Sequence, residues 1–195
     1  MSLQLMQEEG DEDGFLLATA LSGAQRMRAT IAGLMDFAVV GGRLVQTHVD
    51  MGSAVEDVLV DLQTRLGRAE VVVADLPLVW ADEVQVRAVT QNLVANALKY
   101  AGSAPRIAVE GQHLASSTRI TVTDDGPGVP ESQREAIFGL QVRGEGVELT
   151  GVDGLGIGLA TCRRIIDAHG GSIGVEDGPD GGARFWFELP DCSTG

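Results

Sequence analysis

The order of apolar and polar positions divides this chain into helical and extended segments. Apolar residues recur at helical spacing over residues 15–40, which predicts one long helix with a broad apolar stripe, ended by Gly41 and Gly42. Further helices are predicted over residues 53–66, from the N-cap Asp82 to residue 100, over the short piece 133–138, and over 155–168. Alternating or continuously apolar runs predict strands at residues 43–50, 71–73, 78–80, 106–110, 119–123, 172–176 and 183–189.

Together these segments predict an α+β fold. We expect a two-layer α/β sandwich, in which helices cover one face of a mixed sheet, preceded by a long N-terminal helix. Residues 1–42 would hold an acidic N-terminal segment with the long helix, and residues 43–195 the main domain. Residues 139–153 are rich in glycine and lack a hydrophobic period, so we expect a mobile loop there.

Composition narrows the classes of function. Of the 195 residues 44% are hydrophobic, and 28 acidic against 14 basic residues give a net charge of −14. Such a charge argues against general binding to nucleic acid or to a membrane surface, because both favour a basic patch. No apolar run reaches membrane-spanning length, and no signal peptide is visible. The two cysteines form no metal-binding pair, which favours a reducing cytoplasm.

One polar stripe lies on an otherwise amphipathic helix. Asn92, Asn96 and Lys99 are spaced by four and three residues, so they share one face of the predicted helix. A polar stripe by itself is typical of a solvated face. The glycine motifs that follow along the chain favour a ligand-binding face instead.

Two glycine motifs follow this helix. Asp124 ends an apolar strand and begins an Asp-x-Gly-x-Gly turn, whose glycines let the backbone approach a ligand closely; its neighbour Asp125 is expected to be solvated. Downstream, a run of alternating glycines leads into a helix, where backbone amides and the helix N-terminus favour an anion such as phosphate. Its glycines are Gly154, Gly156 and Gly158.

This ordered set of motifs resembles the ATP-binding domain of sensor histidine kinases, in the superfamily shared with gyrase, the Hsp90 chaperones and MutL. The resemblance covers about residues 45–190. It implies that the domain binds ATP with Mg²⁺, that Asn96 is the magnesium ligand and that Asp124 accepts a hydrogen bond from the adenine amino group. The implied nucleotide-binding residues are Asn92, Asn96, Lys99, Tyr100, Asp124, Gly126, Gly128, Arg143, Gly154, Leu155, Gly156, Gly158 and Leu159. Asn92 and Lys99 are the implied catalytic members.

Asn92 distinguishes between branches of this superfamily. In the hydrolytic relatives this position carries a Glu that activates water, whereas an amide has no useful basicity near neutral pH. The resemblance therefore implies phosphoryl transfer to another nucleophile rather than ATP hydrolysis. A chaperone or topoisomerase ATPase is disfavoured for the same reason and by the short chain.

The chain also departs from the kinase pattern. Phe138 fits the family's phenylalanine box and Arg143 is expected to face the phosphates, but Gln141 stands where a second aromatic residue is usual. Arg184 occupies a position where Thr is common. These departures concern lid packing and turnover more than nucleotide binding. None of the histidines has the acidic, helical context of a phosphoacceptor, and His169 is expected to be structural.

The resemblance implies the ATP-binding catalytic region of a two-component sensor histidine kinase, a transferase that moves the ATP γ-phosphate to a histidine missing from this chain. Truncation explains that missing histidine better than loss. Implied partners are the histidine-bearing hairpin of the full-length kinase, a response regulator, and a second copy bound through the N-terminal helix. The location would be the cytoplasm or the cytoplasmic part of a membrane sensor. The alternative is a regulatory module of the same fold, either an anti-sigma-factor-like serine kinase or a degenerate, non-catalytic kinase. The helix at 15–40 resembles the second helix of the kinase hairpin and therefore favours the histidine kinase over the regulatory module.

Overall fold

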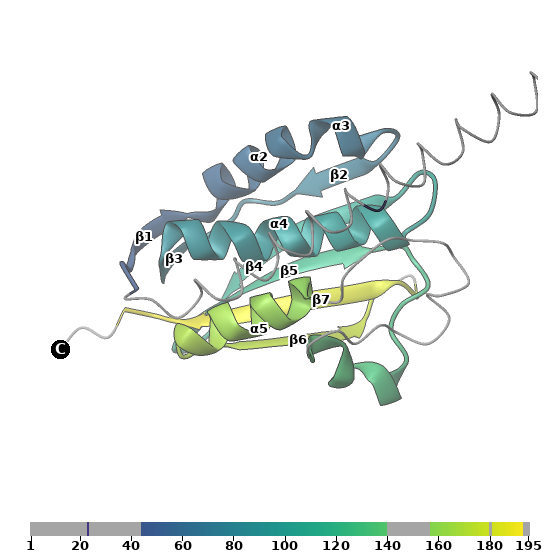
Figure 1. Cartoon of the computed structure of the whole chain (residues 1–195). Coiled ribbons are helices and arrows are strands. Elements are labelled where there is room, and N and C mark those ends of the chain that lie inside the picture. Colours follow the sequence, from purple (N-terminus) through teal and green to yellow (C-terminus); the bar gives the residue numbers. More distant parts are fainter. Residues whose placement is uncertain (1–22, 24–43, 140–156, 180, 193–195) are drawn as a thin grey trace, which may run out of the picture.

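The computed structural model describes Gly23 and residues 44–139, 157–179 and 181–192. The long helix expected at residues 15–40, the division expected between residues 42 and 43, and residues 140–153 of the glycine-rich loop lie outside the described residues. Within them, the strands form two sheets (Figure 1).

The smaller sheet pairs β1 (Thr47–Asp50) with β3 (Leu78–Ala81) in antiparallel fashion. The larger sheet has the strand order β2-β4-β5-β7-β6. β2 runs parallel to β4 and the remaining neighbours are antiparallel, so the sheet is mixed, as predicted. Its strands are β2 (Glu70–Val73), β4 (Arg106–His113), β5 (Ser117–Asp124), β6 (Ser172–Asp177) and β7 (Ala183–Pro190).

Helices cover one face of this sheet, which confirms the predicted two-layer sandwich. α2 (Met51–Asp61), α4 (Glu83–Tyr100) and α5 (Gly158–Ala168) lie side by side on it, with α4 in the middle (Figure 1). The short helix α3 (Gln63–Leu66) follows α2, and two 3₁₀ turns, η1 (Glu131–Gln133) and η2 (Ala136–Phe138), follow β5. No helix of the described residues is long and apolar enough to cross a membrane.

The core lies between the helices and the sheet. Along β5, alternate residues such as Ile120 and Val122 are buried toward the helices, as expected for a sheet covered on one face. Leu93 of α4 and Phe187 of β7 are fully buried among them. Side chains of this size each contribute about 1.5–3 kcal/mol by leaving water, so the central helix is held firmly on the sheet.

The other face of the sheet carries charged side chains. Arg119 of β5 donates to Glu188 of β7 at 2.7 Å, and its guanidinium lies 4.4 Å from the centre of the Trp186 ring. Arg184 donates to Glu110 of β4 at 3.1 Å. Arg184 therefore points away from the helix-covered face, so its substitution for the usual Thr does not place a charge among the helices.

Several element boundaries differ from the prediction by a few residues, as at β1, which begins at Thr47, and two predicted helices differ most. The helix expected at 53–66 begins at Met51, because the Asp50 carboxylate caps it by accepting from the Gly52 N–H at 2.9 Å. It is also interrupted at Leu62, which separates α2 from α3. The short helix expected at 133–138 is two 3₁₀ turns.

Candidate functional site

One face of α4 carries the polar residues that the sequence singled out. Asn92, Asn96 and Lys99 are half-buried along it. The predicted N-cap is confirmed: the Asp82 carboxylate accepts from the Gln85 N–H at 3.2 Å, which fixes where the helix begins. The structure thus presents the three side chains on one continuous helical surface.

Asn92 lies where α4 meets the start of α5. Its Nδ2 donates to the Ala88 carbonyl oxygen, one turn earlier on α4, at 2.9 Å. Its Oδ1 faces Gly158, the first residue of α5, where a Cβ atom would lie 2.5 Å from that oxygen. The absence of a side chain at Gly158 therefore lets α5 begin close against α4. Asn92 joins the two helices and offers no basic group.

The opposite end of this face carries an aromatic ring and a cation. Lys99 Nζ lies 3.0 Å from the Tyr100 hydroxyl oxygen and 4.7 Å from the centre of the Tyr100 ring. Tyr100 is 38% exposed, which leaves part of its ring accessible to a ligand. Gly126 packs against this end, because a Cβ atom at Gly126 would lie 3.2 Å from the Tyr100 carbonyl oxygen.

Asp124 ends β5 beside that same end of α4. Its side chain is on the helix-covered face and the residue is only 7% exposed. Both hydrogen bonds described for the carboxylate end on Oδ1, which accepts from the Gly126 N–H at 2.9 Å and from the Ala183 N–H at 3.3 Å. Burial raises the pKa of the Asp124 carboxyl, and these two hydrogen bonds oppose that rise. The carboxylate is thus held in one orientation by backbone amides.

Glycines surround this carboxylate. Gly128 has a φ of 72°, a left-handed conformation that favours glycine. Gly182, just before β7, lies so close that a Cβ atom there would overlap the Asp124 carbonyl oxygen. Close packing of two backbone segments places the Ala183 amide on the Asp124 side chain. Gly182 and Ala183 therefore belong to the site, although the sequence motifs did not assign them to it.

Asp125 is not simply solvated, contrary to expectation. Its carboxylate accepts from the Arg106 backbone N–H at 2.9 Å and from Arg106 Nε at 3.0 Å. These hydrogen bonds lower the pKa of the Asp125 carboxyl. The pair ties the end of β5 to the start of β4, so it stabilises the backbone on which Asp124 stands. The antiparallel register of β4 and β5 brings Asp125 next to Arg106, and a single sequence does not reveal that register.

The N-terminus of α5 lies at the other end of the α4 face. Ile157, its N-cap, is buried, and Thr161 donates its hydroxyl to the Ile157 carbonyl oxygen at 3.0 Å. Gly158 and Leu159 form the first turn, whose free amides and dipole favour an anion. The other predicted members of this glycine loop lie outside the described residues. These are Arg143, Gly154, Leu155 and Gly156.

The structure brings two loops to one helix face. The Asp124 turn contacts the Tyr100 end of α4, and the start of α5 contacts Asn92. These positions are eight residues apart, or about 12 Å along a helix at its usual rise. Asn96 lies midway between them. The arrangement suits an elongated ligand with a base that donates to a carboxylate at one end and anionic groups at the other.

A metal ion at this site would need oxygen ligands other than a carboxylate cluster. Among the described residues, no group of three or more His, Cys, Asp or Glu side chains is placed to hold a metal. The Asn96 amide supplies one neutral oxygen, which suits Mg²⁺ when the remaining ligands are phosphate oxygens and water. The residues present therefore fit a magnesium ion that arrives with a nucleotide.

Comparison with known proteins identifies relatives. The family described as "Histidine kinase-, DNA gyrase B-, and HSP90-like ATPase" matches residues 81–193. The chain is 34% identical over 179 residues to the phytochrome-like protein Cph1 of Synechocystis sp., covering 88% of this chain and 23% of that protein. It is 44% identical over 117 residues to the adaptive-response sensory kinase SasA of the same organism, covering 60% of this chain and 30% of the kinase. The chain therefore spans about a quarter to a third of these relatives.

Solved structures agree with this relationship. Full-length ShkA in complex with AMPPNP matches with a TM-score of 0.73 and 29% identity, covering 88% of this chain and 37% of ShkA. The nucleotide-free catalytic domain of the histidine kinase ThkA matches with a TM-score of 0.63 and 28% identity, covering 75% of this chain and 97% of that domain. The mixed sheet and its helical layer are thus shared with kinase catalytic domains.

Proposed function

Because the chain belongs to the family of histidine kinase-, DNA gyrase B- and HSP90-like ATPases, we propose that it is the ATP-binding catalytic region of a two-component sensor histidine kinase. The observation that supports this most directly is the single face of α4, which meets a fixed carboxylate at one end and the N-terminus of α5 at the other. ATP has the matching order of groups, with an exocyclic amine on its base at one end and a triphosphate at the other.

Each residue of the site then has a role. The Asp124 carboxylate accepts from the adenine amino group, which selects adenine over guanine because guanine presents an oxygen at that position. Tyr100 contacts the base or ribose, and Lys99 reaches a phosphate as a point charge. Asn96 holds Mg²⁺, which would neutralise charge on the phosphate oxygens. We further assign nucleotide contacts to Gly126, Gly128, Arg143, Gly154, Leu155, Gly156, Gly158 and Leu159.

The reaction is a transfer of the γ-phosphoryl group to a histidine. A ring nitrogen of the acceptor forms a bond to the γ-phosphorus while the bond to the β,γ-bridging oxygen breaks, and ADP leaves with that electron pair. The attacking nitrogen uses its lone pair, and the other ring nitrogen then loses its proton to solvent or to a group on its own segment. The site's residues bind and orient the nucleotide, and Asn92 cannot activate water for hydrolysis.

The wider assembly is also proposed. The acceptor histidine would lie on a hairpin of the full-length kinase, which would dimerise through the segment at residues 15–40. A response regulator would then take the phosphoryl group. We place these events in the cytoplasm, or on the cytoplasmic side of a membrane sensor, because a reducing compartment suits two unpaired cysteines.

The proposal is tested by phosphorylation in trans. The full chain is incubated with γ-labelled ATP, alone and with a separately produced hairpin that carries the acceptor histidine. We expect acid-labile, base-stable label on the hairpin and none on the chain. Asn96→Ala should abolish the transfer, whereas Gln91→Ala, on the exposed side of the same helix, should leave it unchanged.

Three outcomes would contradict the proposal. Acid-stable label on a serine of a partner would indicate a serine kinase of the anti-sigma-factor type. ATP binding without transfer to any hairpin would indicate a non-catalytic module. Acid-labile label on the chain itself would mean that one of its own histidines is the acceptor.

A further inference from the structure

The end of α5 is a tightly specified turn. The Gly171 N–H donates to the Ile166 carbonyl oxygen at 2.9 Å and the Gly170 N–H donates to the Asp167 carbonyl oxygen at 3.0 Å, which is the Schellman pattern. Gly170 has the left-handed φ of 73° that this motif requires. The motif makes His169 the C-cap of the helix and thereby fixes where its ring points.

The His169 ring is buried, and hydrogen bonds engage both of its nitrogens. Nδ1 lies 2.7 Å from the Ile165 carbonyl oxygen, one turn earlier on the same helix. Nε2 accepts from the Asp82 backbone N–H at 3.0 Å. Because a carbonyl oxygen only accepts and an amide N–H only donates, the ring must be neutral with its proton on Nδ1. Nε2 is therefore the acceptor that joins α5 to the start of α4.

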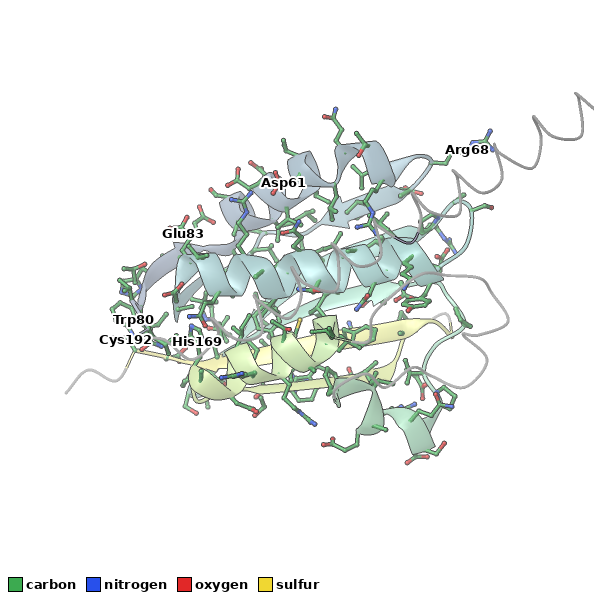
Figure 2. All side chains as sticks on the ribbon, in the orientation of Figure 1. Asp61, Arg68, Trp80, Glu83, His169 and Cys192 are labelled. Carbon is green, nitrogen blue, oxygen red and sulfur yellow. The ribbon has the colours of Figure 1, made fainter. Side chains whose placement is uncertain are left out.

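Asp82 is a junction of three elements. Its backbone N–H bonds to His169 of α5, and its Oδ1 caps α4 through the Gln85 N–H. Its Oδ2 accepts from the Val45 N–H at 3.1 Å, at the point where the chain leads into β1. Figure 2 shows His169 at the same end of the molecule as Trp80, on the strand that leads directly into Asp82. The N-terminal side of the domain thus meets both site helices at one residue.

We propose that His169 is a positioning residue: through Asp82 it sets the spacing of α4 and α5 at the ligand site and couples ligand binding there to the Val45 segment. α5 begins at Gly158, against Asn92, and ends at the His169 ring. α5 is one continuous helix of 11 residues between these two contacts. In the proposed coupling, a ligand that draws in the first turn of α5 strengthens the hydrogen bond between His169 and Asp82, and through Asp82 the bond to the Val45 amide.

Reciprocity makes this coupling measurable from either end. If nucleotide strengthens the His169–Asp82–Val45 chain of hydrogen bonds, weakening that chain must lower nucleotide affinity by the same factor. Coupling between sites is usually about fivefold or more. The inference rests on the proposed ATP site, so Mg-ADP is the probe, and its binding to the unaltered chain is measured first.

Two substitutions separate the hydrogen bonds of the ring. His169→Asn keeps an amide donor near Nδ1 for the Ile165 carbonyl oxygen but has no acceptor at the position of Nε2. His169→Gln is longer and places a carbonyl oxygen where Nε2 stood, so it can accept again from the Asp82 N–H. His113→Asn, on an exposed part of β4, is the control for loss of a histidine.

The readouts are hydrogen exchange at the Asp82 and Val45 amides and the affinity for Mg-ADP, both with the full chain. In the unaltered protein Mg-ADP should slow exchange at both amides by about fivefold or more. His169→Asn should abolish the slowing of exchange at Val45 and lower the affinity for Mg-ADP by a similar factor. His169→Gln should restore most of the slowing and most of the affinity. Nitrogen chemical shifts of the ring should show the proton on Nδ1.

Asp82→Ser provides a test that leaves His169 intact if His169→Asn does not fold. Serine can still cap α4 through Gln85 but is too short to reach Val45, so the Val45 response should disappear and the affinity for Mg-ADP should fall, while the Asp82 amide keeps its bond to His169. The inference is overturned if Mg-ADP binds the unaltered chain without altering exchange at Val45. It is equally overturned if His169→Asn binds and responds like the original. Absence of Mg-ADP binding to the unaltered chain would instead refute the proposed function.

Discussion

Replacing Asp124 with asparagine is the sharpest probe of base recognition, because the change is nearly isosteric. In the unaltered chain the Gly126 and Ala183 amides donate to Asp124 Oδ1 at 2.9 and 3.3 Å. Asparagine can still present an oxygen to both amides. The second oxygen becomes an NH₂ group. In the proposed site that group would point a donor at the adenine amine, which is itself a donor.

The structure sets the expected magnitudes. A hydrogen bond to a charged group contributes about 1.5–3 kcal/mol. Asp124→Asn should therefore lower the affinity for ATP about ten- to hundredfold and leave the fold intact. Asp124→Ala is different, because it leaves two amides beside Asp124 without their acceptor. The Ala183 amide is buried, and a buried unsatisfied group costs about 1–3 kcal/mol, so the alanine variant should lose about 1–3 kcal/mol of unfolding free energy.

Calorimetry with Mg-ATP and Mg-GTP, alongside urea unfolding, measures both quantities. We expect Asp124→Asn to lower ATP affinity without changing the weaker binding of GTP. Unchanged ATP affinity in this variant would refute the role of the carboxylate. Equal affinity of the unaltered chain for ATP and GTP would do the same.

The pH dependence of stability gives an independent check on the environment of Asp124. Burial raises the pKa of its carboxyl above 3.8 in the folded state, so folding favours the protonated form. The stabilisation is complete below the unfolded pKa and is lost as the pH rises through the folded pKa. As the pH rises from the unfolded to the folded pKa of this carboxyl, the unaltered chain should therefore lose stability relative to Asp124→Asn. A constant difference between the unfolding midpoints of the two proteins over this pH range would contradict this expectation.

Three further predictions concern other parts of the molecule. Asn96→Ala should remove the magnesium dependence of nucleotide binding with the circular dichroism spectrum unchanged, and unfolding of this variant would identify Asn96 as a packing residue. Gly182→Ala should lower both stability and ATP affinity, because its Cβ overlaps the Asp124 carbonyl oxygen and must displace β7 or the Asp124 turn. Burial raises the pKa of the Cys162 thiol to about 12, so a thiol reagent should react quickly only with the exposed Cys192 until the chain unfolds. Fast reaction of both thiols in the native protein would contradict the burial of Cys162.

Local patterns in the sequence were enough to predict the layers of the fold. Strict alternation predicted the strand before Asp124, and the N-cap at Asp82 was predicted because capping depends only on residues within one turn. The break at Leu62 was missed because apolar spacing continues through it. The two 3₁₀ turns were predicted as one helix, since short apolar pieces do not distinguish these forms.

The site was predictable only as far as its motifs extend along the chain. Asp124 and its glycines form one short motif, whereas the Ala183 amide that fixes the carboxylate lies 59 positions away. Only the pairing of β5 with β7 brings the two together. The contact of Asn92 with Gly158 likewise depends on the packing of α4 against α5. Contacts of this kind follow from tertiary structure, and residue spacing carries no signal for them.

Asp82 shows how a correctly predicted local role can hide a wider one. As an N-cap it needs one carboxylate oxygen, and any cap residue would satisfy α4. Aspartate has a second oxygen, which takes the Val45 amide, and its own backbone N–H lies before the first turn and is free for the His169 ring. Serine or asparagine would cap the helix without making the same bond to Val45. The choice of aspartate is therefore explained by the junction of three elements, and the helix cap alone does not require it.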